Sequence, residues 1–139
     1  MSRIVLISCV SKKLAYKTIA KNLYISPLFR GNLAYAQSRQ PDKIFILSAK
    51  YGLVKLEQEL EPYNQTLNEM SATENKQWAK KVLEQMHEEM IDFENDEVIF
   101  LAGEKYRKNL LSHFHKASIP LQGLGIGRQL KYLKEQRSL

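Results

Sequence analysis

Three stretches of continuous apolar residues constrain the fold of this 139-residue chain more than any other feature. They are residues 4–8 (IVLIS), 43–48 (KIFILS) and 97–102 (EVIFLA). A strand with one face in water alternates apolar and polar residues, whereas these runs place apolar side chains on both faces. Such strands are typical of parallel sheets that helices cover on both sides. The sequence therefore predicts a buried parallel sheet.

Helical patterns lie between these strands. Residues 27–38 follow Ser26 and open with a proline, which is the usual order of an N-cap and a first helical residue. Residues 71–93, with Thr73 as the expected cap, repeat apolar side chains every four positions. Two more helices are expected at residues 104–115 and 127–136, and one short strand is expected at residues 119–121. Strands that alternate with helices predict one three-layer α/β domain over residues 1–139, with a mostly parallel sheet and helices on both faces.

The longest segment without a helical or strand pattern is residues 50–70. Long irregular loops inside a compact domain are often functional, so we expect this loop to contribute to a site. The chain has a single cysteine, which excludes an internal disulfide and fits a reducing cytoplasm. No apolar run is long enough to span a bilayer, and the short run at the start is interpreted as a strand instead of a signal peptide. We therefore expect a cytoplasmic protein with no membrane partner.

Charge is distributed unevenly along the chain, whose net charge is +6. Residues 1–55 carry ten basic residues and one acidic residue, and residues 98–139 carry eight basic and two acidic residues. The acidic segment 56–97 between them carries twelve acidic and three basic residues. This distribution favours a polyanion or a phosphate-bearing ligand on the basic side of the protein. The alternative is that these charged side chains are solvated on the surface and bind no ligand.

Polar residues follow each of the three predicted strands. In an open parallel sheet, ligands bind beyond the carboxyl ends of the strands, and all three ends open onto one edge. The polar residues at that edge are Ser8, Cys9, Ser11, Lys12 and Lys13 after the first strand, Ser48, Lys50, Tyr51 and Gly52 after the second, and Gly103 and Tyr106 after the third. The sequence therefore predicts that these residues meet at a single pocket.

Each residue type at this edge has a physical use. Gly52 and Gly103 permit a positive φ or a close approach of the backbone to a ligand. Lys12 and Lys50 are point charges for a phosphate or a carboxylate, although one of the two lysines after the first strand is expected to be solvated. Three tyrosines have rings that stack on a base and hydroxyls that hydrogen-bond it: Tyr51, Tyr63 and Tyr106. The alternative for Tyr51 is a core aromatic residue.

Catalytic groups are few. Nearby lysines are expected to lower the pKa of the Cys9 thiol, which favours a nucleophile, whereas the alternative is a small buried residue. Glu104 is the best-placed candidate for a general acid or base, followed by Glu61. The cysteine and the histidines do not have the spacing of metal ligands, so no metal site is expected. The glycine-rich stretch at residues 123–133 lacks the strand and acidic residue of a dinucleotide site, so no cofactor is expected.

Five motifs carry a resemblance to a known family. They are SCVSKK at 8–13, LYISPLF at 23–29, ILSAKYGLV at 46–54, PYNQTL at 62–67 and LAGEKY at 101–106. In this order they resemble an uncharacterised bacterial and phage domain family with C-S-x-x-K, L-Y-x-S-x-x-F, L-S-A-K-Y-G-L and P-Y-x-x-x-L patterns. That family is similar at a distance to the peroxide-stress protein YaaA and to the core domain of archaeosine synthase. The P-C-x-x-K-P-Y-x-x-S motif of the synthase is similar to the set Cys9, Lys12 or Lys13, Tyr24 and Ser26.

The resemblance implies a uracil-DNA-glycosylase-like fold and action on nucleobases in tRNA or DNA. The first hypothesis is thus an enzyme that acts on modified or damaged bases, by glycosidic cleavage or by altering the base, after the base leaves its stack. In this hypothesis Tyr51 or Tyr24 stacks on the base. Lys50 and Lys12 bind a phosphate or stabilise a departing base anion. Asn64 or Gln129 hydrogen-bonds the edge of the base.

Two alternatives use the same sequence features differently. One is a non-catalytic nucleotide or nucleic-acid sensor with the same pocket, since the chain has no obvious acid–base pair. The other is an adaptor whose acidic segment 56–97 binds a partner protein. The sequence leaves the substrate, the reaction and the oligomeric state open.

Overall fold

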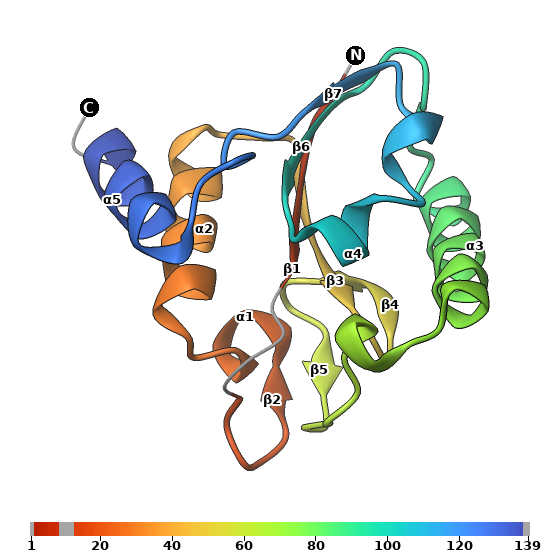
Figure 1. Cartoon of the computed structure of the whole chain (residues 1–139), viewed down its shortest axis with the longest axis horizontal. Coiled ribbons are helices and arrows are strands. Elements are labelled where there is room, and N and C mark those ends of the chain that lie inside the picture. Colours follow the sequence, from red (N-terminus) through yellow and green to blue (C-terminus); the bar gives the residue numbers. More distant parts are fainter. Residues whose placement is uncertain (1, 9–12, 138–139) are drawn as a thin grey trace.

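The computed structural model describes residues 2–8 and 13–137. A five-stranded sheet forms its centre (Figure 1). Its strands are β1 (Arg3–Ser8), β3 (Lys43–Ser48), β4 (Gly52–Lys55), β6 (Glu97–Leu101) and β7 (Lys116–Ser118). They lie in the order β4-β3-β1-β6-β7, and only β4 runs antiparallel to its neighbour. The mostly parallel sheet predicted from the apolar runs is confirmed.

The centre of the sheet is also the centre of the hydrophobic core. Side chains Ile4 to Ile7 of β1 are almost completely buried. In register with them, Leu6 lies opposite Phe45 of β3 and Phe100 of β6. Because β1 has a parallel neighbour on each side, both of its faces need covering by helices, which explains its unbroken apolar sequence.

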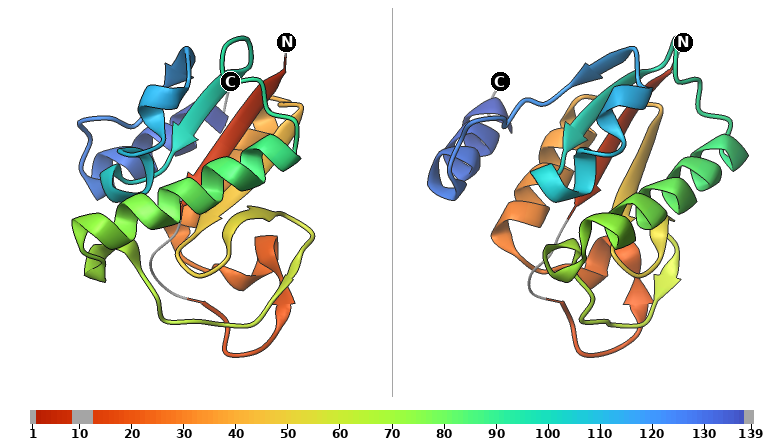
Figure 2. Two further views of the ribbon diagram at one scale, coloured as in Figure 1. Left: turned by 90° about the vertical axis from the view of Figure 1, so that its right-hand side faces the viewer. Right: turned by 45° about the vertical axis from the view of Figure 1, so that its right-hand side comes forward.

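Helices lie on both sides of this sheet. They are α1 (Ala20–Leu23), α2 (Pro27–Ser38), α3 (Ala72–Glu88), α4 (Glu104–Arg107) and α5 (Ile126–Arg137). Figures 1 and 2 show α2 and α5 on one side of the sheet and α3 on the other. The helix α5 packs against α2, where a Cβ atom on Gly31 would come within 3.2 Å of Leu133 Cδ1. The glycine therefore lets the two helices approach closely.

The boundaries of α2 agree with the sequence prediction. Ser26 is its N-cap, and the Ser26 Oγ atom accepts a hydrogen bond of 3.1 Å from the Phe29 N–H. Pro27 occupies the first turn, where a missing N–H costs nothing. The local signals at this end were sufficient because they do not depend on distant parts of the chain.

Other element boundaries were predicted wrongly. The cap of α3 is Ser71 and not Thr73, because Ser71 and Glu74 form a reciprocal capping box. This helix ends at Glu88 and does not reach residue 93, since Met90 has a left-handed φ of 60°. The expected helix at 104–115 is also shorter. It ends at Arg107 and is followed by the 3₁₀ turn Leu111–His113. Between these two elements, the Asn109 side chain donates a hydrogen bond to Asn75 on α3.

Two predictions that concern strands were also wrong. The strand expected at 119–121 lies at Lys116–Ser118, where Ala117 pairs with Val98 of β6. The segment 50–70 is not irregular, because it contains β4, the short strand β5 (Glu59–Leu60) and the 3₁₀ turn Leu67–Glu69. Strand β5 pairs with β2 (Thr18–Ile19) in a separate two-stranded sheet. These pairings join segments that lie far apart in sequence, so local patterns do not indicate them.

Candidate functional site

A pocket of about 420 Å³ lies at the carboxyl ends of β1 and β6. Its wall is completed by α2, by α4 and by the segment that leads into α5. The apolar residues of the lining are Leu28, Phe29, Phe100, Leu101, Ala102, Ile119 and Leu121. The polar and charged ones are Ser8, Ser26, Asn32, Asn68, Glu104, Lys105, Arg107 and Gln129, with Gly103 and Tyr106 beside them. The pocket therefore combines apolar walls with a limited set of polar groups, as small-molecule sites do.

Six of the predicted site residues line this pocket: Ser8, Ser26, Gly103, Glu104, Tyr106 and Gln129. The Gly103 N–H donates a hydrogen bond of 3.1 Å to Ser8 Oγ, which fixes the ends of β1 and β6 relative to each other. On the opposite wall, Gln129 Nε2 donates to the Leu124 carbonyl at 2.8 Å and so orders the entry into α5. The rule that ligands bind beyond parallel strand ends thus located part of the lining.

The end of β3, the second of the predicted strands, lies in a neighbouring group of side chains. We call this group the tyrosine cluster: Lys13, Tyr24, Ser48, Tyr51 and Tyr63. Ser48 Oγ accepts from the Tyr51 N–H at 3.0 Å and donates to Tyr63 Oη at 2.9 Å. The hydroxyls of Tyr63 and Tyr24 are 2.6 Å apart, and Lys13 Nζ lies 4.5 Å from the centre of the Tyr63 ring. None of these five residues lines the pocket described above. The structure therefore places the strand ends in two groups and not one.

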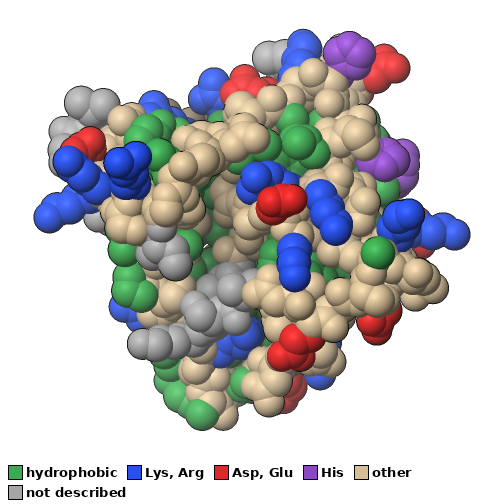
Figure 3. Space-filling model, viewed as in Figure 1, with side chains coloured by type: hydrophobic (Ala, Val, Ile, Leu, Met, Phe, Trp, Pro, Cys, Tyr) green, Lys and Arg blue, Asp and Glu red, His purple; other side chains and the backbone are tan. Residues whose placement is uncertain are grey.

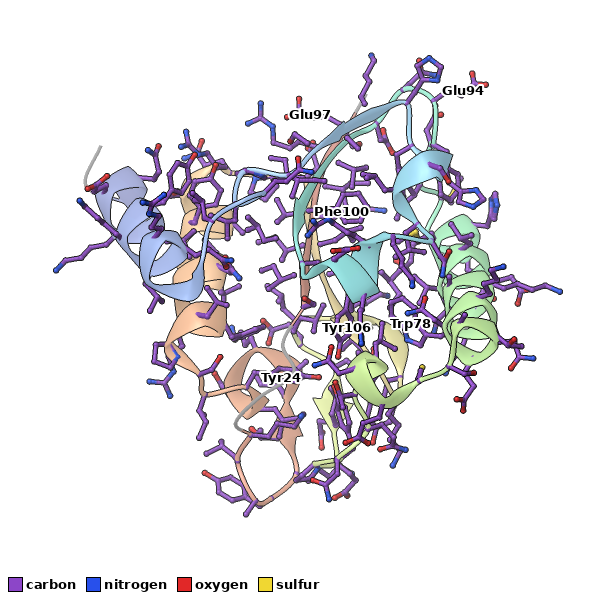
Figure 4. The ribbon with its side chains drawn as sticks, in the orientation of Figure 1. Tyr24, Trp78, Glu94, Glu97, Phe100 and Tyr106 are labelled. Atoms are coloured by element: carbon purple, nitrogen blue, oxygen red, sulfur yellow. The ribbon has the colours of Figure 1, made fainter. Side chains whose placement is uncertain are left out.

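Three of the four rings proposed to stack on a base are largely covered in this structure, and the fourth, that of Tyr51, is half-buried. Tyr24, Tyr63 and Tyr106 are 1%, 7% and 3% exposed. Tyr24 packs on Phe29 with ring centres 5.1 Å apart, and Tyr106 packs edge-on against Trp78 at 5.8 Å (Figure 4). Tyr106 is therefore part of the pocket wall, whereas Tyr24 packs against the lining residue Phe29 without lining the pocket itself.

The remaining predicted residues lie elsewhere. Lys50 is exposed, and its Nζ atom lies 5.3 Å from the centre of the Tyr51 ring. Asn64 is exposed and is not part of the pocket lining. Three predicted residues fall outside the described residues: Cys9, Ser11 and Lys12.

Gly52 closes the turn between β3 and β4 with a φ of 77°. A Cβ atom there would collide with the side chain of Gln85. That side chain accepts from the Leu53 N–H at 2.8 Å and donates to the Tyr51 carbonyl at 3.2 Å. The close approach that this glycine permits is therefore to Gln85 of α3. Gly103, in contrast, has a φ of −63° and open space around its Cβ position.

Asn32 of α2 is a lining residue that sequence reasoning missed. It is 3% exposed, and its Oδ1 atom finds no hydrogen-bond partner among the described residues. Such an orphaned acceptor is uncommon in a folded protein. A signal was present in the sequence, because Asn32 lies three residues after Phe29 and four before Ala36, both on the buried face of the helix. A polar residue on an apolar helix face could have been singled out.

Comparison with known proteins identifies the family. A model for a family of unknown function, DUF6884, matches residues 4–135. The chain belongs to the DUF6884 family. No curated protein and no solved structure matches it. The expectation of an uncharacterised domain family is thus met, while the likeness to YaaA and to archaeosine synthase and the uracil-DNA-glycosylase-like fold stay predictions.

In this DUF6884 domain, charged groups gather at the mouth of the pocket. Figure 3 shows a hollow with basic side chains and one acidic side chain along its border. The charged lining residues are Glu104, Lys105 and Arg107 of α4. The Arg107 Nη1 atom donates to the Ala102 carbonyl at 2.7 Å, and Lys105 Nζ donates to the Asn68 carbonyl at 3.3 Å. The mouth therefore carries a net positive charge.

Some groups outside the pocket of this DUF6884 domain have displaced pKa values. Hydrogen bonds from Ser71 lower the pKa of Glu74 at the start of α3. Burial, together with Tyr35, raises the pKa of Tyr132 on α5. Across residues 2–8 and 13–137, no group of three or more His, Cys, Asp or Glu side chains is arranged to hold a metal ion. Within the same residues, no helix has the length and apolar character needed to cross a bilayer.

Proposed function

We propose that the protein recognises a nucleobase in the pocket at the ends of β1 and β6, and that it acts on that base. The observation that carries this proposal is the unpaired Oδ1 atom of Asn32 in the pocket wall. A buried acceptor without a partner costs about 1–3 kcal/mol, and a ligand that donates a hydrogen bond removes that cost. A carboxamide presents an acceptor and donors in one plane, which is the pattern that pairs with the edge of a base.

The size and walls of the pocket support a flat heterocycle as the ligand. Its volume of about 420 Å³ lies within the range of about 300–1,000 Å³ that is usual for small-molecule sites. Phe29 and Phe100 supply aromatic surface in the lining, and Ile119 and Leu121 supply aliphatic surface. Burial of a nearly planar ring between such side chains is favourable, and a single polar residue then selects the orientation of the ring.

Glu104 is the group we assign to chemistry. It is the one carboxylate in the described part of the lining, and it lies at the mouth of the pocket as the first residue of α4. In this position the carboxylate can activate water by accepting a proton from it, and the protonated carboxylic acid can donate a proton to a leaving base, so glycosidic cleavage or base modification is the proposed reaction type. The resemblance to enzymes that work on nucleobases supports a reaction directed at the base.

The alternative is a non-catalytic nucleotide sensor. One observation favours it: Glu104 is exposed and has no histidine, cysteine or second carboxylate beside it in the described lining. A base that is only bound and read needs Asn32 and the apolar walls and does not need Glu104. The two versions therefore share a ligand and differ in the role of one residue.

The experiment combines binding with product analysis. Nucleosides are titrated against the protein with Trp78 fluorescence as the readout, because Trp78 is the single tryptophan and packs on the pocket residue Tyr106. DNA, tRNA and nucleosides are then incubated with the protein and analysed by mass spectrometry. Loss or alteration of a base that Glu104→Gln abolishes supports the enzyme, and saturable binding without any product supports the sensor. Absence of binding by every nucleoside up to millimolar concentration contradicts both.

A further inference from the structure

We infer that the mouth of the pocket is a phosphate subsite formed by Lys105 and Arg107, so that the ligand is a nucleotide unit and not a free nucleobase. This inference rests on the proposed function, since it assumes that the base occupies the pocket interior. It adds the chemical class of the ligand and two residues that the prediction from sequence did not include.

Both cations are available for an anion. The ion pairs between described side chains involve other residues, and neither Lys105 nor Arg107 takes part in one. The single bond from Arg107 Nη1 to the Ala102 carbonyl orients the guanidinium and leaves most of its five N–H donors for a ligand. The bond from Lys105 Nζ to the Asn68 carbonyl is long and has a neutral acceptor, which a phosphate oxygen would displace.

The polar groups of the pocket are also distributed as a nucleotide requires, with an amide at the buried end and cations at the exposed end. Asn32 is nearly completely buried on α2, whereas Lys105 is exposed and Arg107 is half-buried on α4. A ligand that fits both regions has a planar polar group at its buried end and an anionic group at its exposed end. Sugar and phosphate attached to a base meet this description, and a free base does not.

Glu104 limits where the phosphate can lie. Its carboxylate lines the same mouth and repels an anion, so the phosphate must lie on the side of Lys105 and Arg107.

The phosphate could belong to a free mononucleotide or to a strand from which one base has been extruded. The shared chemistry is a phosphate ester attached to the sugar of the bound base. A single set of titrations separates the two sources. The protein is titrated with a nucleoside, with the 5′-monophosphate of that nucleoside, and with a short single-stranded oligonucleotide that contains it.

The test is calorimetric titration of the 139-residue protein at low and at high salt. We expect the mononucleotide to bind about tenfold more tightly than the nucleoside at low salt, and that ratio to shrink as salt screens the phosphate contacts. Lys105→Gln is expected to reduce the ratio about fivefold. Lys108→Gln is the matched control, since it removes the same charge from an exposed residue next to α4 that does not line the pocket.

The outcomes separate this inference from the proposed function. If the nucleoside and the mononucleotide bind equally well, the phosphate subsite is refuted and base recognition stands. If Lys108→Gln reduces the ratio as much as Lys105→Gln does, the effect is one of overall charge and the subsite is again refuted. If no nucleoside binds at all, the proposed function fails first. An oligonucleotide that binds more tightly than the mononucleotide, with the same dependence on Lys105, supports the subsite with a strand as the source.

Discussion

Replacement of Asn32 by leucine should stabilise the protein and abolish ligand binding. The substitution keeps the branched shape of the side chain and removes the carboxamide, whose Oδ1 atom is unpaired among the described residues. Loss of an unsatisfied buried acceptor is worth about 1–3 kcal/mol, and leucine has a helix propensity about 0.4 kcal/mol better than asparagine. We therefore expect the free energy of unfolding to increase by about 1–3 kcal/mol.

The assay is thermal and denaturant unfolding of the ligand-free protein. For a chain of this size, about 1 kcal/mol corresponds to a shift of roughly 4 °C in Tm. The Asn32→Leu variant should therefore melt at least about 4 °C above the wild type. Calorimetric titration of the same variant should show that it has lost nucleoside binding. Greater stability together with lost binding is the result expected of a residue retained for a ligand.

Asn75 on α3 provides a matched control. It is 3% exposed, as Asn32 is, and it also lies within a helix. Its Nδ2 atom donates to the Lys105 carbonyl at 2.9 Å, and its Oδ1 atom accepts from Asn109 at 2.8 Å. Asn75→Leu leaves both partners unpaired and should destabilise the protein by about 1–3 kcal/mol. If Asn32→Leu were as destabilising as Asn75→Leu, the reasoning about the orphaned acceptor would be refuted.

Three further predictions concern residues outside the pocket lining. Gly52→Ala should destabilise the protein by at least about 2 kcal/mol in urea, because a Cβ atom at a φ of 77° meets Gln85; an unchanged midpoint would contradict this. Ser48→Ala should cost about 1–3 kcal/mol, since the tyrosine cluster loses a donor and an acceptor; equal Tm values would argue against the cluster. The pKa of Glu74 is lowered in the folded state, so its contribution to the stability of the protein is present above pH 4.5 and is lost as the pH falls. Glu74→Gln should therefore make the stability of the protein depend less steeply on pH in the acid range.

Local sequence signals predicted the parts of the fold that depend on local interactions. Ser26 and Pro27 defined the start of α2 because capping involves neighbouring residues only. The buried strands β1, β3 and β6 were found because two covered faces require an unbroken apolar run. In contrast, β5 was missed because its partner β2 lies about forty residues earlier, and two-residue strands have no periodicity of their own.

The same distinction applies to the site. Ser8 and Gly103 were predicted because parallel strands end at one edge, and they do join there through a hydrogen bond. The end of β3 lies at that edge too, but Ser48 bonds to Tyr63 and forms part of a separate cluster. Asn32 was missed because it comes from the middle of a helix. Its place in the pocket depends on how α2 packs on the sheet, and a rule about residues that follow strands does not predict this packing.

The most direct test of base recognition is to follow the side-chain amide of Asn32 by NMR while a nucleotide is added. In ¹⁵N-labelled protein, with Asn32→Leu used to assign the signal, the Asn32 side-chain resonances should move markedly on binding. The Asn75 side-chain amide, which is already paired within the protein, should move little. If a nucleotide binds and the Asn32 amide signals stay in place, the ligand does not contact this residue and the account of the pocket is contradicted.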